Sequence, residues 1–348
     1  MNIAFFSAVA YDAADGGRTR IIADELAKRH RVHFIDLPSL RHPGACGSSA
    51  VPNGVVRYHI TPLPLFWRSF DTAVGELWVR RVVRFLQSQL PPDTRAVVST
   101  PFWAPVLRKL RIHSMTYECL DHGSMGCFGA PEAVVERLEN NLAMNARQIV
   151  CASRKIARLW NNRTAKPLHV ISNGFPADFP TRPYKLPERP VAGFCGPTCG
   201  CFDAALVAKC ARALPDVRFI LSGPARRGWH MLRLSALSNV EIGPQPPSGR
   251  VADEIERYTV GMIPFVQNDI SFFGDPLQIY EYLALGRPVV STVDNGGGLP
   301  VQVAEDAGDF IAALEKALYA PADAAALRDA VSGRSWAEIA ARMEAILE

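Results

Sequence analysis

The sequence predicts an α/β protein of two facing Rossmann-like domains, and three observations support this fold class. The chain has 348 residues, 48% of them hydrophobic and 21% charged, which is a globular composition on a chain too long for one core. Short apolar runs alternate with amphipathic stretches in both halves, as expected for strands and helices of doubly wound parallel sheets. A proline-rich segment interrupts this alternation near the middle of the chain.

The first half begins with an apolar run at 3–7, a helical stretch at 18–29 and a second apolar run at 32–37. This order predicts a strand–helix–strand unit. Further strands are expected at 55–60, 96–99, 115–117 and 148–152, and further helices at 75–89, 133–145 and 155–160. We therefore place the N-terminal domain at 1–175.

Five prolines lie between residues 176 and 190, with few apolar residues among them, and this segment is the predicted linker. The alternation then restarts and predicts a second Rossmann-like domain over 191–335. Its strands are expected at 191–195, 218–222, 240–243, 260–265 and 288–292, and its helices at 203–214, 251–258 and 276–285. The last segment, 336–348, is amphipathic and predicts a helix that crosses back to the N-terminal domain.

Charge and cysteine usage narrow the class of partner. The formal net charge is +4, which is too weak to make nucleic acid the expected partner. Residues 1–7 read as a strand and not as a signal peptide, and no uninterrupted apolar run reaches the length of a membrane span. Eight scattered cysteines fit a reducing compartment, and those near 195–210 lack the paired spacing of a zinc site. We expect a cytoplasmic protein without a metal, free or peripheral on the inner face of the membrane.

Two glycine-rich turns follow predicted strands, at the edge where open α/β sheets bind ligands. Gly16 and Gly17 follow the first strand, where they let a backbone approach a bound group or simply form a strand-to-helix turn. Gly196 follows the strand at 191–195 and suits a diphosphate, with a tight turn as the alternative. Arg226 follows a later strand and is either a phosphate partner or an ordinary solvated charge.

The helix expected at 276–285 has marked ends. Asp275 can accept hydrogen bonds from the first turn, and Pro276 is suited to the first helical position. Gly286 follows the last apolar residue and is a typical helix stop. The helix is apolar apart from one amide and one carboxylate, so it is expected to be buried.

The polar residues of this helix predict a ligand. Gly274, Gln278 and Glu281 are spaced four and three apart, which places them on one stripe of a helix. A buried carboxylate is costly without a partner, and the stripe can accept a sugar or phosphate, a linking group and a ribose diol in that order. The alternative is that Glu281 pairs with Arg287.

Segment 275–292, DPLQIYEYLALGRPVVST, resembles the donor-binding region of GT-B-fold glycosyltransferases, particularly the family 4-like group that builds bacterial surface polysaccharides. Supporting segments occur in the expected order, namely Gly16-Gly17, 172–175, 193–203, 239–243 and 261–265. The resemblance implies that Glu281 binds the ribose hydroxyls of a nucleotide and that the glycine-rich stretch before it approaches the diphosphate and sugar. The chain departs from the family at Phe273, where a glutamate is usual, and at Gln278, where many relatives carry lysine.

A candidate catalytic base follows the predicted strand at 115–117. Asp121 and His122 are expected at the carboxyl edge of the sheet, where either can take a proton from an acceptor hydroxyl. Asp121 is similar to the catalytic aspartate of bacterial glucuronosyltransferases with this fold, and the alternative is an aspartate that caps a turn. Glu118 and His122 are the reserve candidates, and His122 also belongs to the expected acceptor loop.

The expected function is hexosyl or uronosyl transfer from a nucleoside-diphosphate sugar, with UDP as the expected carrier, to a saccharide or lipid-linked acceptor. No cofactor or metal is expected, because a helix N-terminus and basic side chains can neutralise a departing diphosphate. Two other hypotheses stay open, a nucleotide-sugar epimerase of the same fold and a non-catalytic nucleotide-sugar-binding protein. Conversion of the free nucleotide sugar without an acceptor would indicate the epimerase, and binding without turnover would indicate the non-catalytic protein.

Segment 63–85 mixes aromatic and basic residues, which suits either a core helix or contact with an anionic lipid surface. We assign Trp78 and Phe85 to the core. Phe66, Trp67 and Phe70 stay open between core and membrane-facing positions.

Overall fold

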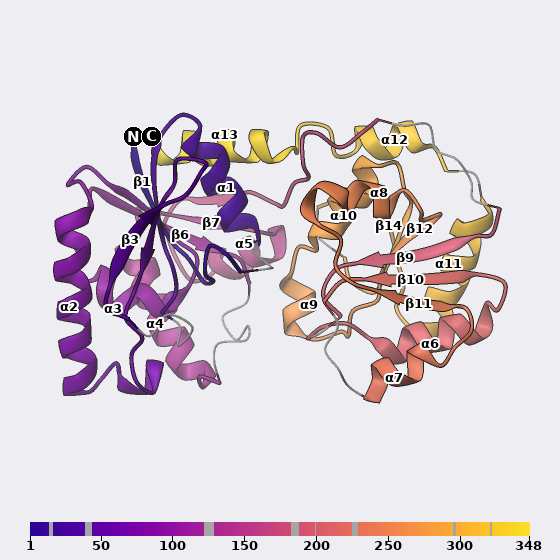
Figure 1. The fold of residues 1–348 in the computed structure, drawn as a ribbon, viewed down its shortest axis with the longest axis horizontal. Helices are drawn as coiled ribbons and strands as arrows, with labels where there is room; N and C mark the ends of the chain where they lie inside the picture. The colour runs from indigo at the N-terminus through magenta and orange to yellow at the C-terminus, as the bar shows by residue number, and fades with distance from the viewer. Residues whose placement is uncertain are drawn as a thin grey trace. The chain divides into compact units, whose positions relative to one another are not determined.

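The computed structural model describes residues 1–13, 17–38, 44–121, 129–181, 188–198, 200–224, 229–294, 297–320 and 322–348. The chain divides into two compact units (Figure 1). Unit 1 contains Met1–Ser172 together with Trp336–Glu348, and unit 2 contains Asn173–Ser335. The chain therefore passes from one unit to the other at two points, and residues 173–181 belong to unit 2.

Unit 1 is built on a sheet that has eight strands within the described ranges, in the order β3-β4-β2-β1-β5-β6-β7-β8. The strands are β1 (Asn2–Phe6), β2 (Arg31–Ile35), β3 (Gly47–Ala50), β4 (Val56–His59), β5 (Arg95–Val98), β6 (Ser114–Cys119), β7 (Gln148–Cys151) and β8 (Leu168–Val170). All neighbours are parallel except β3 and β4. A parallel sheet needs both faces covered, which explains why β1 and β2 are buried except at their first residues.

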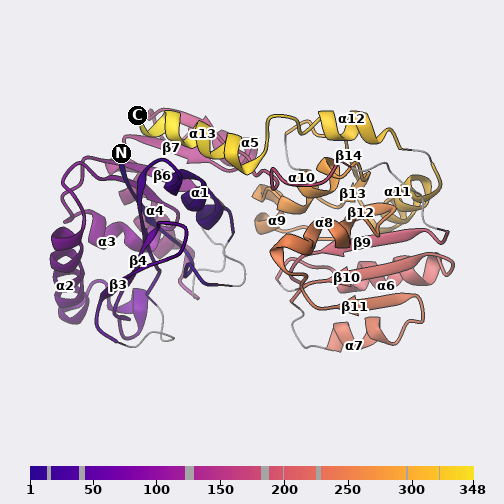
Figure 2. The ribbon, with the colours of Figure 1, turned by 45° about the horizontal axis from the view of Figure 1, so that its top comes forward.

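Helices from both ends of the chain cover this sheet. They are α1 (Gly17–Ala27), α2 (Ala73–Gln89), α3 (Ala104–Leu107), α4 (Glu132–Asn145), α5 (Arg154–Asn161) and α13 (Trp336–Leu347). Figure 2 shows α13, the last helix, lying against α1. Its buried residues recur at helical spacing, at Trp336, Ile339, Ala340, Met343 and Leu347. The predicted C-terminal helix therefore packs on unit 1.

Unit 2 is built on a sheet of six parallel strands, counted over the residues that the structure describes, in the order β11-β10-β9-β12-β13-β14. The strands are β9 (Val191–Cys195), β10 (Arg218–Ser222), β11 (Val240–Gly243), β12 (Val260–Ile263), β13 (Val289–Ser291) and β14 (Val301–Val303). Numbered from β9, this is the order 3-2-1-4-5-6 of a Rossmann fold, and it reverses between β9 and β12. The second domain is therefore Rossmann-like, as predicted.

Two helical layers cover the sheet of unit 2. Its helices are α6 (Ala204–Ala213), α7 (Trp229–Ser235), α8 (Val251–Ile255), α9 (Asp269–Phe273), α10 (Leu277–Ala284), α11 (Ala307–Tyr319) and α12 (Ala324–Asp329). Side chains from α6 and α11 pack on one face with Phe219 and Leu221, whereas α8 and α10 pack on the other face with Ile220. This alternation along β10 follows from the two-residue period of a strand.

The helix that carries Glu281 begins later than predicted. Pro276 is its N-cap residue, with extended backbone, and no side chain caps the first turn, so Asp275 lies before the helix. The end is as predicted, because Gly286 has φ +71°. The N–H of Gly286 donates to Leu283 O at 2.9 Å and that of Arg287 to Tyr282 O at 2.8 Å, and these bonds close the last turn of the helix.

The aromatic residues of segment 63–85 divide between core and surface. Trp78 is buried, as predicted, and its Nε1–H donates to Thr61 O at 2.7 Å. Phe85 is half-buried against the ring of Tyr58, and Phe70 is buried. Trp67 is half-buried beneath the guanidinium of Arg68. Within the described ranges, no helix combines the length and the apolar character needed to cross a membrane.

Candidate functional site

The first part of the candidate site lies at the carboxyl edge of the sheet in unit 2. Open α/β sheets bind ligands outside the carboxyl ends of their strands, where the strand order reverses. Here that position is between β9, which ends at Cys195, and β12. Gly196 directly follows β9, so the structure places it at this reversal point, as predicted.

Three glycines that follow or end strands at this edge form what we name the glycine shelf: Gly196, Gly223 and Gly243. The N–H of Gly196 donates to Ser222 O at 2.8 Å, and that of Gly223 to Gly243 O at 3.3 Å. A Cβ added at Gly223 would lie 1.9 Å from Gly196 O, which is a backbone atom. Only glycine fits at Gly223 without a backbone shift, so the loops after β9 and β10 approach each other closely at this edge.

Gln278, on the first turn of α10, lies directly over this shelf. A Cβ at Gly196 would be 2.5 Å from Gln278 Nε2. The structure therefore brings together two predicted donor-site residues that are 82 positions apart in the sequence. An amide here can donate to a phosphate or sugar oxygen, although it lacks the charge of a lysine.

Glu281 follows one turn later on the same face of α10 as Gln278. It is buried, and burial raises the pKa of its carboxyl to about 8. The structure assigns this carboxylate no hydrogen bond or ion pair with any described residue. Arg287 instead donates to Glu256 O at 2.9 Å, so the alternative of a Glu281–Arg287 pair is wrong. A buried carboxylate in this state is available to a ligand.

Glu281 also lies near the end of β9. Burial raises the pKa of the Cys195 thiol to about 12, and the charge of Glu281 contributes to that rise. The N–H of Cys195 donates to Tyr282 Oη at 2.9 Å, which ties α10 to the strand end. The helix and the glycine shelf are therefore held in a fixed relation.

Two predicted donor-site residues, Gly274 and Asp275, lie before α10 and not on it. The carboxylate of Asp275 accepts from Asn173 N–H at 2.6 Å and from Tyr280 Oη–H at 2.7 Å. These bonds hold Asp275 to the segment where the chain enters unit 2, and a donor-binding role for Asp275 stays a prediction. Gly274 lies between α9 and α10, outside either helix, so the predicted stripe is reduced to Gln278 and Glu281.

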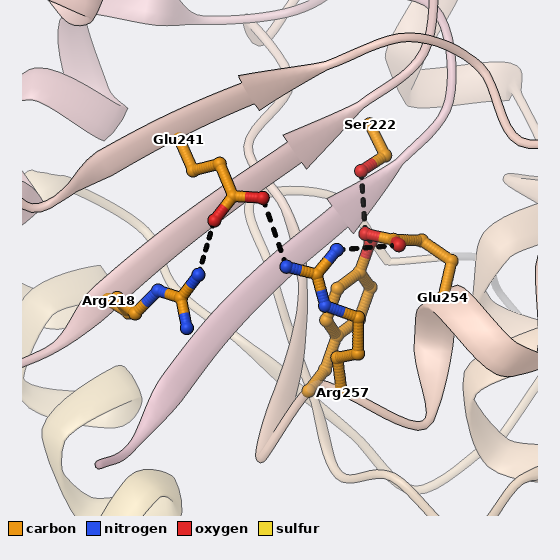
Figure 3. Close-up of polar contacts among 6 residues, drawn as sticks. Arg218, Ser222, Glu241, Glu254 and Arg257 are labelled. Carbon is orange, nitrogen blue, oxygen red and sulfur yellow. Dashed lines mark hydrogen bonds and ion pairs between the residues drawn. The ribbon is translucent and has the colours of Figure 1, made fainter.

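A chain of polar and charged contacts begins at Ser222, the residue before Gly223, and joins α8 to β10 and β11 (Figure 3). The hydroxyl of Ser222 donates to Glu254 Oε1 at 2.6 Å, and Arg257 joins Glu254 to Glu241 at 2.8 and 3.0 Å. Arg218 pairs with the other oxygen of Glu241. Sequence analysis missed Ser222 and Glu254, and the one available signal was the Ser222-Gly223 pair at a strand end.

In unit 1, the turn after β1 opens α1 at Gly17, which has φ +55°. The next residue, Arg18, donates through Nε to Glu118 Oε1 at 2.9 Å. The hydroxyl of Ser99 donates to the other oxygen of Glu118 at 2.8 Å. Glu118 is fully buried and paired, so its prediction as a reserve base is wrong.

Asp121 lies two residues beyond β6, at the carboxyl edge of the sheet in unit 1. It is half-buried, and burial raises the pKa of its carboxyl to about 6. Its side chain has no hydrogen bond or ion pair in the part of the chain that the structure describes. Its backbone carbonyl accepts from the Cys119 thiol at 3.2 Å. A carboxylate with a pKa near neutrality is suited to general base catalysis.

The predicted residues Gly16, His122 and Arg226 lie outside the described residues. Cys199 of the cysteine cluster lies outside them as well. Among the residues that are described, no group of three or more His, Cys, Asp or Glu side chains is arranged to hold a metal ion.

Comparison with known proteins gives one similar sequence. No model of a known protein family matches the chain. A Bacillus subtilis (strain 168) protein provisionally named teichuronic acid biosynthesis glycosyltransferase TuaH is 26% identical over 175 residues, which is 46% of this chain. The match spans 43% of that relative, less than half of its length.

Similar structures cover nearly the whole chain. Sucrose-phosphate synthase from Thermosynechococcus elongatus has a TM-score of 0.75 at 16% identity, over 99% of this chain and 98% of that one. HepE from Anabaena, solved with UDP and glucose, has a TM-score of 0.72 at 15% identity over 99% and 98%. The UDP-forming α,α-trehalose-phosphate synthase from Burkholderia vietnamiensis has a TM-score of 0.67 at 13% identity over 99% and 97%.

These likenesses define the class of fold. The chain has the two-domain GT-B fold of glycosyltransferases, and the resemblance first noted at residues 275–292 is confirmed at the level of the fold. Sequence identities of 13–16% show a shared fold and nothing more. An activity for this protein has to be argued from the residues of its candidate site.

Proposed function

We propose that this protein is a glycosyltransferase that moves a sugar from a nucleoside-diphosphate sugar to a saccharide or lipid-linked acceptor during surface-polysaccharide or glycoconjugate synthesis. The observation that carries the proposal is the buried carboxylate of Glu281, which has no protein partner in the described ranges and lies one turn from Gln278 over the glycine shelf. A carboxylate in this state can accept hydrogen bonds from both hydroxyls of a ribose.

The proposed donor is a UDP-sugar. HepE was solved with UDP and with UDP-glucose, and its fold extends over the whole of this chain. In our proposal the diphosphate lies against the glycine shelf near the N-terminus of α10, where the helix dipole favours negative charge. Metal-independent transfer is part of the proposal for the same reason. Hexosyl or uronosyl transfer is also part of the proposal, and the name of the B. subtilis relative, a glycosyltransferase of teichuronic acid biosynthesis, supports glycosyl transfer.

Asp121 is the proposed catalytic base. It would take the proton of the acceptor hydroxyl as that oxygen attacks the anomeric carbon and the nucleoside diphosphate leaves. Its pKa near 6 leaves it largely ionised at neutral pH while keeping it basic enough to accept a proton. This role implies inversion at the anomeric carbon.

The first experiment is a titration of the purified protein with UDP, GDP and ADP by calorimetry. We expect UDP to bind best, and Glu281→Ala to weaken it by about tenfold or more, because the ribose loses a charged hydrogen-bond acceptor. Unchanged UDP affinity in Glu281→Ala would show that the donor site lies elsewhere.

The second experiment measures UDP release from UDP-glucose and UDP-glucuronate, with and without saccharide acceptors. We expect Asp121→Asn to lower turnover by about 10²–10⁴-fold and to leave UDP affinity unchanged. Full turnover in Asp121→Asn would reject the base. Conversion of the free donor without an acceptor would identify an epimerase, and an absence of turnover with tight UDP binding would identify a non-catalytic binder.

Peripheral contact with an anionic membrane is a further part of the proposal, supported by one face of α2. Val74 and Leu77 are 55% and 70% exposed, and Arg81 and Arg84 continue the same face at helical spacing. Leu65, in the turn before α2, is 74% exposed. Apolar residues beside arginines that have no ion pair within the described ranges suit the surface of anionic lipid.

This contact is tested by flotation with vesicles of phosphatidylglycerol or phosphatidylcholine. We expect binding to the anionic vesicles alone, and its loss in the double variant Arg81→Glu/Arg84→Glu. Arg212→Glu, an exposed change on α6 of unit 2, is the charge control. Equal binding of both variants would show that α2 does not make the contact.

A further inference from the structure

A buried hydrogen-bond chain lies directly behind Asp121. The indole Nε1–H of Trp160 donates to Cys119 Sγ at 3.3 Å, and the thiol of Cys119 donates to the backbone carbonyl of Asp121 at 3.2 Å. Cys119 is the last residue of β6, and Trp160 is on α5. Both are almost completely buried, so water does not compete for these bonds.

The direction of this chain follows from the chemistry of its members. An indole nitrogen can only donate, so the sulfur accepts from Trp160. A thiol has one hydrogen, and its two acceptors are Asp121 O at 3.2 Å and Glu139 Oε1 at 3.8 Å. Burial raises the pKa of the Cys119 thiol well above its usual value, and the charge of Glu139 adds to the rise. The sulfur therefore stays protonated and donates to the nearer acceptor, Asp121.

The carboxylate of Glu139 has hydrogen-bond donors other than Cys119. Its carboxylate accepts from Tyr117 Oη–H at 2.8 Å and from Arg163 at 3.2 Å. Arg163 also lies over the ring of Trp160, with 4.4 Å between the guanidinium carbon and the ring centroid. Glu139 and Arg163 thus hold Trp160 in place, and the thiol is left for Asp121.

We propose that Cys119, itself held by Trp160, is a positioning residue that fixes the backbone at Asp121 and so sets the direction and burial of its carboxylate. This inference rests on the proposed role of Asp121 as the catalytic base. Without the thiol hydrogen bond, the backbone carbonyl of Asp121 is no longer tied to the side chain of Cys119 at the end of β6.

Loss of this anchor has two measurable consequences. A base displaced by about 1 Å can cost up to roughly 10²-fold in turnover. A carboxylate that becomes more exposed loses the burial that raises its pKa, so its pKa falls from about 6 toward its ordinary value of 3.8. The acid limb of the pH–rate profile then moves to lower pH.

The experiment compares Cys119→Ala, Cys119→Ser and Trp160→Phe with wild type. Three quantities are measured: turnover of UDP-glucose, UDP affinity by calorimetry, and the pKa of Asp121 from carboxyl ¹³C NMR, assigned with Asp121→Asn. We expect Cys119→Ala to lower kcat by about 10–10²-fold, leave UDP affinity unchanged and lower the pKa of Asp121. Cys119→Ser keeps a donor and is expected to restore both kcat and the pKa to near wild type.

Cys151→Ala is the matched control. Cys151 is a free cysteine opposite Cys119 on the neighbouring strand β7, is also buried, and has no hydrogen bond to Asp121 in the described structure. The control removes the same atom from the same core, so it reports the cost of a cavity alone. Equal changes in Cys119→Ala and Cys151→Ala would overturn the proposal.

Failure of this inference is distinct from failure of the proposed function. If Asp121→Asn abolishes turnover while Cys119→Ala keeps both kcat and the pKa of Asp121, the positioning role is wrong and the base stands. If Asp121→Asn keeps turnover, the base is wrong. Should Cys119→Ala not fold, Trp160→Phe decides, since it keeps an aromatic ring and removes the N–H. An unchanged kcat and an unchanged pKa of Asp121 in Trp160→Phe would overturn the proposed positioning role of Cys119 and Trp160.

Discussion

The carboxyl of Glu281 is buried without a compensating cation among the described residues, so ionising it has a cost in the ligand-free protein. Burial raises its pKa from 4.5 to about 8, so the carboxyl is mostly protonated at neutral pH. Two ribose hydroxyls donate best to the ionised form. Binding of the proposed donor therefore requires release of a proton from Glu281.

This linkage predicts a pH-dependent affinity. We expect the affinity for UDP to rise by up to roughly tenfold per pH unit below pH 8 and to level off above it. Calorimetry in buffers of different ionisation enthalpy would detect the released proton. Glu281→Gln should bind UDP weakly with no rise, whereas the exposed change Glu315→Gln on α11 should behave as wild type. A flat profile in wild type would contradict the linkage.

The raised pKa of Glu281 also makes the free energy of unfolding depend on pH. The folded-state pKa of Glu281 lies above the unfolded value, so the stability it contributes is complete below pH 4.5 and is lost as pH rises to about 8. Glu281→Gln should therefore raise the denaturation midpoint at pH 9 and leave it nearly unchanged at pH 4. Urea unfolding at the two pH values would measure the difference.

Some single residues were predictable from the sequence, and others were not. Glu281 stood out because a carboxylate in an apolar, capped helix needs a partner. The pairing of Glu118 was not predicted, because its partner Arg18 is 100 positions away in the chain. The bond from Asn173 to Asp275 was not predicted either, since those residues are 102 positions apart. The residues next to a carboxylate in the sequence do not show whether a distant residue pairs with it. A paired carboxylate and an unpaired one therefore cannot be distinguished from local sequence.

At the scale of elements, the glycine shelf depends on how closely three strand ends approach. The sequence predicted the strand that precedes Gly196, with bounds identical to those of β9. It did not predict the contact between Gly223 and the carbonyl of Gly196, because that contact joins two loops from different strands. Register within a parallel sheet decides it, and β9 and β10 are paired from Val191↔Arg218 to Cys195↔Ser222.

This geometry predicts that Gly223→Ala damages the shelf. The added Cβ would lie 1.9 Å from Gly196 O, and backbone must move to accommodate it. We expect a loss of about 1–3 kcal/mol in the free energy of unfolding, measured with urea, and weaker UDP binding. Gly249→Ala is the control, because a Cβ there meets no atom within 4 Å. Equal stability of the two variants would show that the loops are not tightly packed.

At the scale of the whole molecule, the last helix belongs with the first residues of the chain. Glu344 on α13 contacts both Arg29 and His30, at 2.5 and 2.6 Å, and Gln148 on β7 donates to Ile346 O at 2.5 Å. These contacts link the C-terminus to elements more than 190 positions earlier. Unit 1 is therefore complete only when the chain has passed through unit 2 and returned.

Because α13 packs on unit 1, a substitution in its buried face is expected to destabilise unit 1. Met343 is fully buried against unit 1, so Met343→Asp should destabilise unit 1 by several kcal/mol. Hydrogen exchange should show faster exchange in β1 and β7 while β9 and β10 keep their protection. The exposed change Arg342→Asp is the charge control. Equal loss of protection in both sheets would show that the units unfold together.

The sequence by itself determined the class of fold, the order of most long elements and the helix that carries Glu281. Hydrophobic period, prolines and glycines are local signals, and they are present in the chain before it folds. Short elements such as β3, β8 and β14, and the helix α11, were missed, because their stability comes from the elements beside them. Only the tertiary structure decided which carboxylates are occupied. Glu118 and Asp275 are paired, while Glu281 and Asp121 are held in low-polarity surroundings with raised pKa values, because burial and distant partners are properties of packing.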